Sequence, residues 1–293
     1  MSENFATANG LTLCFETFGA REKPALLLIM GLGAHMIQWD ETFCEALAAR
    51  GFFVIRFDNR DVGRSSKIEM APNALASALQ TAMTLKPFSP PYLLADMAAD
   101  SVGLLDALKI DTAHIVGASM GGAIAQKIAL LYPERVKTLV SIMSTTSERD
   151  LPPPNPQVRE IFFKPPPRDA DEYVKANVEA WRLMRGDDDP DEVARDERRA
   201  RRAAQRAPLC PEGGARQMLA MLGSGGRRSR LIAVKAPTLV IHGADDPLVP
   251  LPCGEDTARS IPGARLLVLD KMGHALPRRV WAPILEAIAA HAQ

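Results

Sequence analysis

The sequence GASMGG at residues 117–122 decides the fold, because it places a serine between two glycines where a strand gives way to a helix. The apolar run before it, residues 114–116, has strand character, and the residues after it continue with helical spacing. In a G-x-S-x-G turn, Gly117 and Gly121 let the strand and the helix approach without a clash between β-carbons. The turn lifts the hydroxyl of Ser119 above the carboxyl end of the sheet, beside the positive end of the helix dipole. The pattern predicts a nucleophile elbow, and the alternative is a tight turn with an incidental serine.

A base and an acid are expected further along the chain, because a serine hydroxyl becomes a useful nucleophile only when a base takes its proton. Among the five histidines, His274 lies on a loop after the last predicted strand, from which an imidazole can reach the serine. The acid is expected at the carboxyl end of the preceding strand, where Asp245 and Asp246 are adjacent. Asp246 is the preferred candidate, because Pro247 fixes the chain just after it, and Asp245 is the competitor. The predicted catalytic residues are therefore Ser119, Asp246 and His274.

An oxyanion hole would complete this arrangement with two backbone amides. One is the amide of Met120, the residue after the nucleophile, and the other is that of Leu32, in the loop at residues 30–34. The glycine pair of this loop could instead begin a dinucleotide-binding fingerprint. That fingerprint requires a third glycine where this chain has Met36, so the oxyanion interpretation is favoured.

The predicted strands are apolar throughout rather than alternating, which indicates burial on both faces of a sheet. They cover residues 25–30, 52–57, 114–116, 136–142, 238–241 and 264–269, with helical patterns at 37–50, 92–108 and 120–131. Strands that alternate with helices in this way predict an α/β fold with a mostly parallel sheet flanked by helices. A C-terminal helix follows, and Pro283 is expected to break or kink it.

A stretch rich in proline, arginine and aspartate interrupts this alternation at residues 147–230. It has no strand-like run, whereas helical patterns can be drawn near 170–185, 190–206 and 212–222. The sequence thus predicts an α/β core formed by residues 1–146 and 231–293, with an inserted helical cap at 147–230. A second insert, at residues 67–91, is expected to be irregular.

Six arginines lie close together in the predicted cap. Acidic residues alternate with them, which favours a solvated helix face with ion pairs four residues apart over a site for an anionic substrate. The six are Arg195, Arg198, Arg199, Arg201, Arg202 and Arg206.

The composition argues against several other classes of protein. Lys plus Arg and Asp plus Glu both total 35, so no overall basic field exists to bind nucleic acid or an anionic membrane. The longest apolar run is far shorter than the ~20 residues of a membrane span, and the first residues lack a secretory signal pattern. Four widely spaced cysteines without a CxxC pair argue against a zinc site and favour free thiols in a reducing compartment. We therefore expect a cytoplasmic protein without nucleic-acid or membrane partners.

Three of these motifs together resemble the α/β-hydrolase superfamily, whose triad has the chain order serine, aspartate, histidine. They are GASMGG at 117–122, HGADD at 242–246 and GH at 273–274. The segments MGLG at 30–33, FDNRDVGRS at 57–65 and SIMSTT at 141–146 resemble the branch that includes aclacinomycin methylesterase-like enzymes. One departure is Met30, where many relatives have histidine. Since the oxyanion donor is a backbone amide, this difference changes the pocket lining more than the chemistry.

The resemblance implies a serine hydrolase without a cofactor or metal ion, with a helical cap over its pocket. The residues then predict a carboxylic ester hydrolase that uses water and an acyl-enzyme to cleave small-to-medium esters. The activities that stay open are lactonase, carbon–carbon bond hydrolase, cofactor-free perhydrolase or haloperoxidase, and proline iminopeptidase, and a non-catalytic ligand binder is the alternative from another class. The candidate pocket residues are Met30, Gly31, His35, Met143, Met218 and Met221. The sequence indicates neither the physiological ester nor the oligomeric state.

Overall fold

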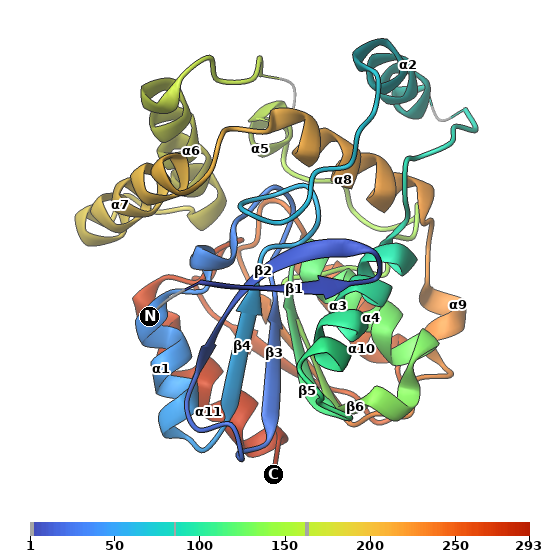
Figure 1. Ribbon diagram of the computed structural model, residues 1–293, viewed down its shortest axis with the longest axis vertical. Helices are drawn as coiled ribbons and strands as arrows, with labels where there is room; N and C mark the ends of the chain where they lie inside the picture. The colour runs from blue at the N-terminus through green and yellow to red at the C-terminus, as the bar shows by residue number, and fades with distance from the viewer. Residues whose placement is uncertain (1–2, 85, 162–163) are drawn as a thin grey trace.

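A computed structural model describes residues 3–84, 86–161 and 164–293 of the chain. Within these residues, eight strands form one sheet in the order β1-β2-β4-β3-β5-β6-β7-β8 (Figure 1). The strands are β1 (Asn4–Ala8), β2 (Leu11–Phe18), β3 (Ala25–Ile29), β4 (Phe53–Phe57), β5 (Ala113–Ala118), β6 (Val136–Ile142), β7 (Thr238–Gly243) and β8 (Arg265–Leu269). The β1–β2 and β2–β4 pairs are antiparallel and the other neighbours are parallel, so the predicted α/β class is confirmed.

Helices connect these strands and cover the sheet. They are α1 (Glu41–Ala49), α2 (Pro72–Met83), α3 (Leu94–Ala107), α4 (Met120–Leu131), α5 (Pro156–Glu160), α6 (Ala170–Arg185), α7 (Pro190–Arg206), α8 (Pro211–Gly223), α9 (Arg228–Leu231), α10 (Leu251–Ser260) and α11 (Trp281–His291). Short 3-10 turns at Met36–Gln38, Pro133–Arg135 and Arg278–Val280 complete the described elements. Within the described residues, no helix is long and apolar enough to span a membrane.

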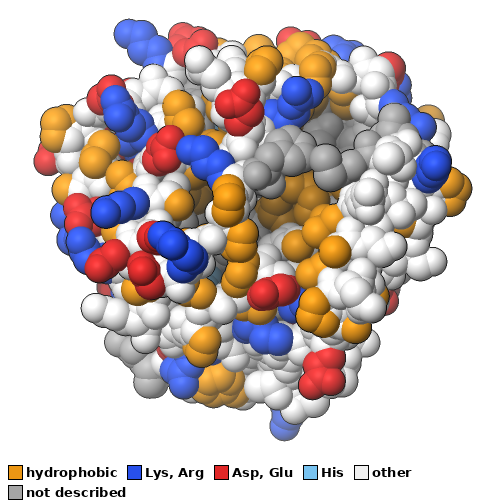
Figure 2. Space-filling view, turned by 90° about the horizontal axis from the view of Figure 1, so that it is seen from above, with side chains coloured by type: hydrophobic (Ala, Val, Ile, Leu, Met, Phe, Trp, Pro, Cys, Tyr) orange, Lys and Arg blue, Asp and Glu red, His pale blue; other side chains and the backbone are white. Residues whose placement is uncertain are grey.

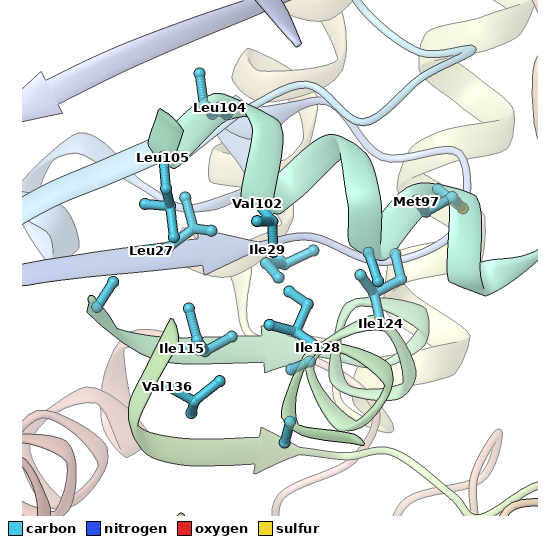
Figure 3. Packing of buried hydrophobic residues seen from close by; sticks show 14 of the residues in the cluster. Leu27, Ile29, Met97, Val102, Leu104, Leu105, Ile115, Ile124, Ile128 and Val136 are labelled. Carbon is cyan, nitrogen blue, oxygen red and sulfur yellow. The ribbon is translucent and has the colours of Figure 1, made fainter. Parts of the chain in front are cut away.

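The central strand β3 shows why its sequence is apolar at every position. Leu27 and Ile29 belong to a buried cluster with residues of α3 and α4, as Figure 3 shows. Leu26 and Leu28 belong to a second cluster, with residues of α1 and α11. Because neighbouring side chains of a strand point to opposite faces, a strand covered on both faces must be apolar throughout.

The parallel strands end at one edge of the sheet, and α5 to α8 lie beyond that edge (Figure 1). Local sequence explains where the two longest of these helices begin. The carboxylate of Asp169 accepts a hydrogen bond from an amide in the first turn of α6. Asp189 does the same for α7, and Pro190 follows it at the first helical position. Both arrangements satisfy amides that have no partner within the helix.

Two predictions about local structure are wrong. Residues 67–91 contain the helix α2, whose Leu75 packs against Leu219 of α8. This packing joins segments far apart in the chain, so the local pattern did not show it. Pro283 does not break α11, because the helix begins at Trp281 and proline in the first turn removes an amide that has no helical partner.

Candidate active site

Ser119 lies at the turn between β5 and α4, with φ 56° and ψ −122°. Positive φ is uncommon for any residue except glycine, and strain of this kind is typical of a nucleophile elbow. A β-carbon at Gly117 would lie 2.1 Å from the carbonyl oxygen of Gly121. A β-carbon at Gly121 would lie 2.1 Å from the carbonyl oxygen of Ile29. No side chain can share this space with backbone, so both glycines are required for α4 to start directly against the sheet.

The three side chains selected from the sequence lie together at this turn. Oγ of Ser119 is 2.9 Å from Nε2 of His274, and Nδ1 of His274 is 2.7 Å from Oδ2 of Asp246. The other carboxylate oxygen of Asp246 accepts hydrogen bonds of 2.9 and 2.8 Å from two backbone amides of the following turn. His274 and Asp246 are buried, whereas Asp245 is exposed. The carboxylate in contact with the imidazole is therefore that of Asp246 and not that of its neighbour.

The loop that carries His274 rests on the carboxyl end of α6. The amide of His274 donates a hydrogen bond of 2.7 Å to the carbonyl oxygen of Met184. A β-carbon at Gly273 would lie 2.4 Å from the same oxygen, so only glycine permits this contact. The helix α6, which lies between β6 and β7 in the sequence, thus fixes the backbone of His274.

The loop after β3 lies beside the elbow. A β-carbon at Gly31 would lie 3.0 Å from the β-carbon of the serine. The amide of Ala34 donates within the turn, and that of Gly33 donates to a side chain of α8, whereas the amide of Leu32 has no partner among the described residues. Met120 is the first residue of α4, where an amide has no intrahelical partner. The amides of Leu32 and Met120 therefore have the free donor capacity that an oxyanion hole needs.

A buried loop after β4, residues 58–61, makes hydrogen bonds to both ends of the segment from Met30 to Met36. Asn59 donates a hydrogen bond of 2.9 Å to the carbonyl oxygen of Met30. The carboxylate of Asp58 accepts one of 2.8 Å from the amide of Met36. Both ends of the segment that carries Leu32 are thus fixed to the same loop.

A small cavity lies between the core and the α6–α7 pair. Met30 and Met143 line it from the ends of β3 and β6, and Trp181, Arg185 and Arg199 line it from the helices. Seen from above, this end of the molecule has a central hollow with hydrophobic side chains on its walls and mixed basic and acidic side chains on one flank (Figure 2). The two methionine side chains give the core side of this cavity an adaptable apolar surface.

Three other pocket candidates, His35, Met218 and Met221, do not line this cavity. Nδ1 of His35 accepts a hydrogen bond of 3.4 Å from Arg206, and burial lowers the pKa of His35 below its usual value. Met221 packs against the main core cluster, and Met218 is half-buried on the same helix. Among the described residues, those that line the cavity between the core and α6–α7 do not include these three.

The expectation of a solvated arginine face is wrong for half of the run. Arg195 is only 4% exposed and pairs with Glu192 at 2.6 Å. The side chain of Arg206 is 5% exposed and pairs with Asp58 at 2.7 Å, and Arg199 pairs with Asp196. A buried guanidinium requires such a partner, and Asp58 lies far away in the sequence. Local spacing therefore could not distinguish buried arginines from solvated ones.

The chain belongs to the α/β-hydrolase fold family, whose family model matches residues 24–277. It is 32% identical to the rhodomycin D methylesterase DnrP of Streptomyces peucetius, over 99% of this chain and 98% of that protein. A second such enzyme, DauP of Streptomyces sp. strain C5, has the same identity and coverage. These relatives confirm the predicted resemblance to the methylesterase branch.

One solved structure and a further sequence relative agree with this family. A hydrolase from Pseudomonas aeruginosa PA01 superimposes with a TM-score of 0.72 and 29% sequence identity, covering 99% of this chain and 98% of that one. A putative carbamate hydrolase, RutD of Variovorax paradoxus, is 30% identical over 90% of each chain. The fold is thus shared by proteins whose names describe different hydrolytic reactions. The reaction must therefore be inferred from the residues of the site and not from the fold.

Proposed function

We propose that this protein is a serine carboxylic ester hydrolase whose catalytic triad is Ser119, His274 and Asp246. The observation that carries the proposal is the unbroken series of contacts from the serine oxygen through the imidazole to a buried carboxylate, at 2.9 and 2.7 Å. The names of the two Streptomyces relatives support an ester as the substrate. The other activities and the non-catalytic binder considered from the sequence have no comparable support.

In the first half of the reaction, Oγ of Ser119 attacks the ester carbonyl carbon while Nε2 of His274 accepts the hydroxyl proton. Asp246 accepts the hydrogen bond from Nδ1–H, which holds the imidazole in the required tautomer and stabilises the cation. The same proton then passes to the leaving alkoxide, so the alcohol departs and an acyl-enzyme remains. Because Asp246 and His274 are buried, water screens this charge separation only weakly.

The amides of Leu32 and Met120 would bind the negative charge that develops on the carbonyl oxygen. Each donor of this kind is worth about 3 kcal/mol of transition-state stabilisation. In the second half of the reaction, water loses a proton to His274 and attacks the acyl carbon. Collapse of the tetrahedral intermediate then releases the acid and restores Ser119. No step requires a cofactor or a metal ion.

The proposed preference for apolar groups rests on the lining of the cavity between the core and α6–α7. Met30 and Met143 present apolar surface on the core side of the cavity, which favours a small-to-medium apolar acyl or alcohol group.

We assign the cap to residues 147–230, since α5 to α8 lie over the carboxyl edge of the sheet (Figure 1). The free state of all four cysteines agrees with a reducing cytoplasm.

The test combines turnover with covalent labelling. Ser119→Ala should lower kcat for short- and medium-chain p-nitrophenyl esters about 10⁶-fold, because the nucleophile is lost. A fluorophosphonate should add one mass increment to the wild type at Ser119 and none to the variant. Ser229→Ala, at an exposed serine of α9, is the matched control and should keep both turnover and labelling. Undiminished turnover in Ser119→Ala, or an unlabelled wild type, would reject the proposal.

A further inference from the structure

The turn that carries Leu32 has a central peptide with two possible orientations. It spans Gly31 to Ala34, and the amide of Ala34 donates to the carbonyl oxygen of Gly31 at 3.3 Å. Gly33, at the third position, has φ 66°. In four-residue turns, a positive φ at this position accompanies one orientation of the central peptide, and the commoner negative φ accompanies the flipped one. Because Gly33 has no side chain, the turn alone does not strongly favour either orientation.

A side chain of α8 selects the observed orientation. Oε1 of Gln217 accepts a hydrogen bond of 2.8 Å from the amide of Gly33, the donor of that central peptide. Nε2 of Gln217 donates one of 2.7 Å to the carbonyl oxygen of Arg60. Gln217 is 0% exposed, so no water competes for either end of its amide. A peptide flip at Gly33 would leave the buried Oε1 without its donor, which is costly.

The helix that carries Gln217 is itself fixed to the core beside this contact. The guanidinium of Arg216 makes two hydrogen bonds to the carboxylate of Asp61, at 2.7 and 3.0 Å. Both side chains are buried, and Tyr92 donates to the same carboxylate at 2.5 Å. Such paired, charge-assisted bonds define position as well as energy. The oxygen of Gln217 is therefore held at a defined place relative to the turn.

We propose that Gln217 is a positioning residue for the oxyanion hole, a role that rests on the proposed esterase function. Residues 58–61 hold the two ends of the segment from Met30 to Met36, and Gln217 holds its middle. Its carboxamide fixes the peptide adjoining Leu32 and so keeps the Leu32 amide directed at the developing oxyanion. It contacts neither the substrate nor the serine, and its effect passes through the backbone of the turn.

The test is Gln217→Met, which keeps the length of the side chain and removes both hydrogen bonds. We expect kcat for a p-nitrophenyl ester to fall roughly ten- to a hundredfold with KM little changed, because the oxyanion contact strengthens only in the transition state. A trifluoromethyl ketone, which forms a hemiketal oxyanion with the serine, should bind more weakly by a similar factor. An unchanged kcat and an unchanged ketone affinity would overturn the proposal.

Two further variants separate the acceptor role of Gln217 from a general disturbance of α8. Gln217→Glu retains an acceptor for the amide of Gly33 and should recover most of the kcat that Gln217→Met loses. If the glutamate variant is as slow as the methionine variant, the acceptor is not what matters and the proposal fails. Glu212→Gln, at an exposed residue of the same helix, leaves both hydrogen bonds of Gln217 in place, so it should keep kcat within a few-fold of the wild type. An equal loss of kcat in Glu212→Gln would also overturn the proposal.

Labelling of the wild type keeps this test separate from the proposed function. If a fluorophosphonate does not modify Ser119 in the wild type, the esterase assignment fails before Gln217 is considered. If the wild type is labelled and turns over esters while Gln217→Met is equally active, only the positioning role is rejected.

Discussion

The serine and the histidine of the candidate site are held by different parts of the chain. Ser119 is fixed by its immediate neighbourhood, where Gly117 and Gly121 allow β5 and α4 to meet at a strained turn. His274 is fixed by distant segments. Its ring contacts Asp246, after β7, and its amide bonds to Met184, at the end of α6.

A second inserted helix supports the same histidine loop. Arg195 of α7 donates to the carbonyl oxygen of Leu276 at 3.3 Å. Glu192 accepts a hydrogen bond of 2.8 Å from the amide of Arg278. Helices outside the sheet thus position the histidine, whereas the sheet positions the serine. We expect substitutions at these contacts to move the imidazole while the elbow keeps its geometry.

On the histidine side, the largest expected effect comes from the carboxylate that contacts the imidazole. Asp246→Asn should lower kcat about 10⁴-fold, because an amide does not hold the imidazole in the tautomer that accepts the serine proton. Ester turnover measures the loss, and thermal unfolding checks that the variant is folded.

Asp245→Asn is the matched control for this prediction. The side chain of Asp245 is exposed, and the carboxylate that contacts His274 is that of Asp246. We expect turnover of the control to stay within about twofold of the wild type, as for an ordinary surface substitution. Equal losses in the two variants would contradict the assignment of the acid.

A smaller effect is expected where the histidine loop meets α6. Gly273→Ala places a β-carbon 2.4 Å from the carbonyl oxygen of Met184, so the loop or the helix must move. A displacement of about 1 Å at a catalytic group costs roughly 10²-fold in rate, and we expect a fall in kcat of this size. Steady-state kinetics with a p-nitrophenyl ester measures the change.

Gly214→Ala serves as the control for a glycine on an inserted helix. It lies in α8, and a β-carbon there would meet nothing within 4 Å. It should keep full activity and gain roughly 0.5–1 kcal/mol of stability from the better helix propensity of alanine. If Gly273→Ala is as active as this control, the base does not depend on its contact with α6.

The sequence predicted the features that local pattern determines. The apolar strands β3 to β7 and the glycine-flanked turn at Ser119 are readable because each depends on a few consecutive residues. The helices α6, α7 and α8 lie within a residue or so of the expected ranges, since capping residues and proline mark their starts. The three side chains selected as a triad lie within hydrogen-bonding distance.

The features that sequence analysis missed depend on contacts between distant segments. The edge strand β1 is short and largely exposed, so it lacks an apolar pattern. Gln217 has no motif of its own and is informative only once Gly33 and Arg60 are placed beside it. Arg206 reads as a surface residue until Asp58, its buried carboxylate partner, is placed beside it. For Gln217 and Arg206, the informative partner lies too far away in the sequence for residue spacing to reveal it.

The smallest expected effect is a loss of stability at low pH that comes from His242, a buried histidine on the histidine side of the site. Burial lowers the pKa of His242, in β7, below 6.5. Its Nε2 donates to the carbonyl oxygen of Val249 at 2.7 Å, and its Nδ1 has no partner among the described residues. Protonation of Nδ1 would therefore bury an unpaired charged donor. As pH falls below about 6.5, the unfolded chain takes up this proton before the folded one, so the free energy of unfolding must fall.

Urea unfolding of the wild type and of His242→Gln, at neutral pH and near pH 5, isolates this residue. Glutamine can still donate to Val249 and does not titrate, so the variant should lose less stability on acidification than the wild type does. Burial also lowers the pKa values of His35, His114 and His291, and these contribute equally in both proteins. The difference between the two pH-dependent losses therefore reports His242 together with its electrostatic interactions with Asp246 and His274. Identical losses of stability would mean that the folded protein accommodates a charged His242 beside Asp246. His242 would then not make the histidine side of the site sensitive to acid.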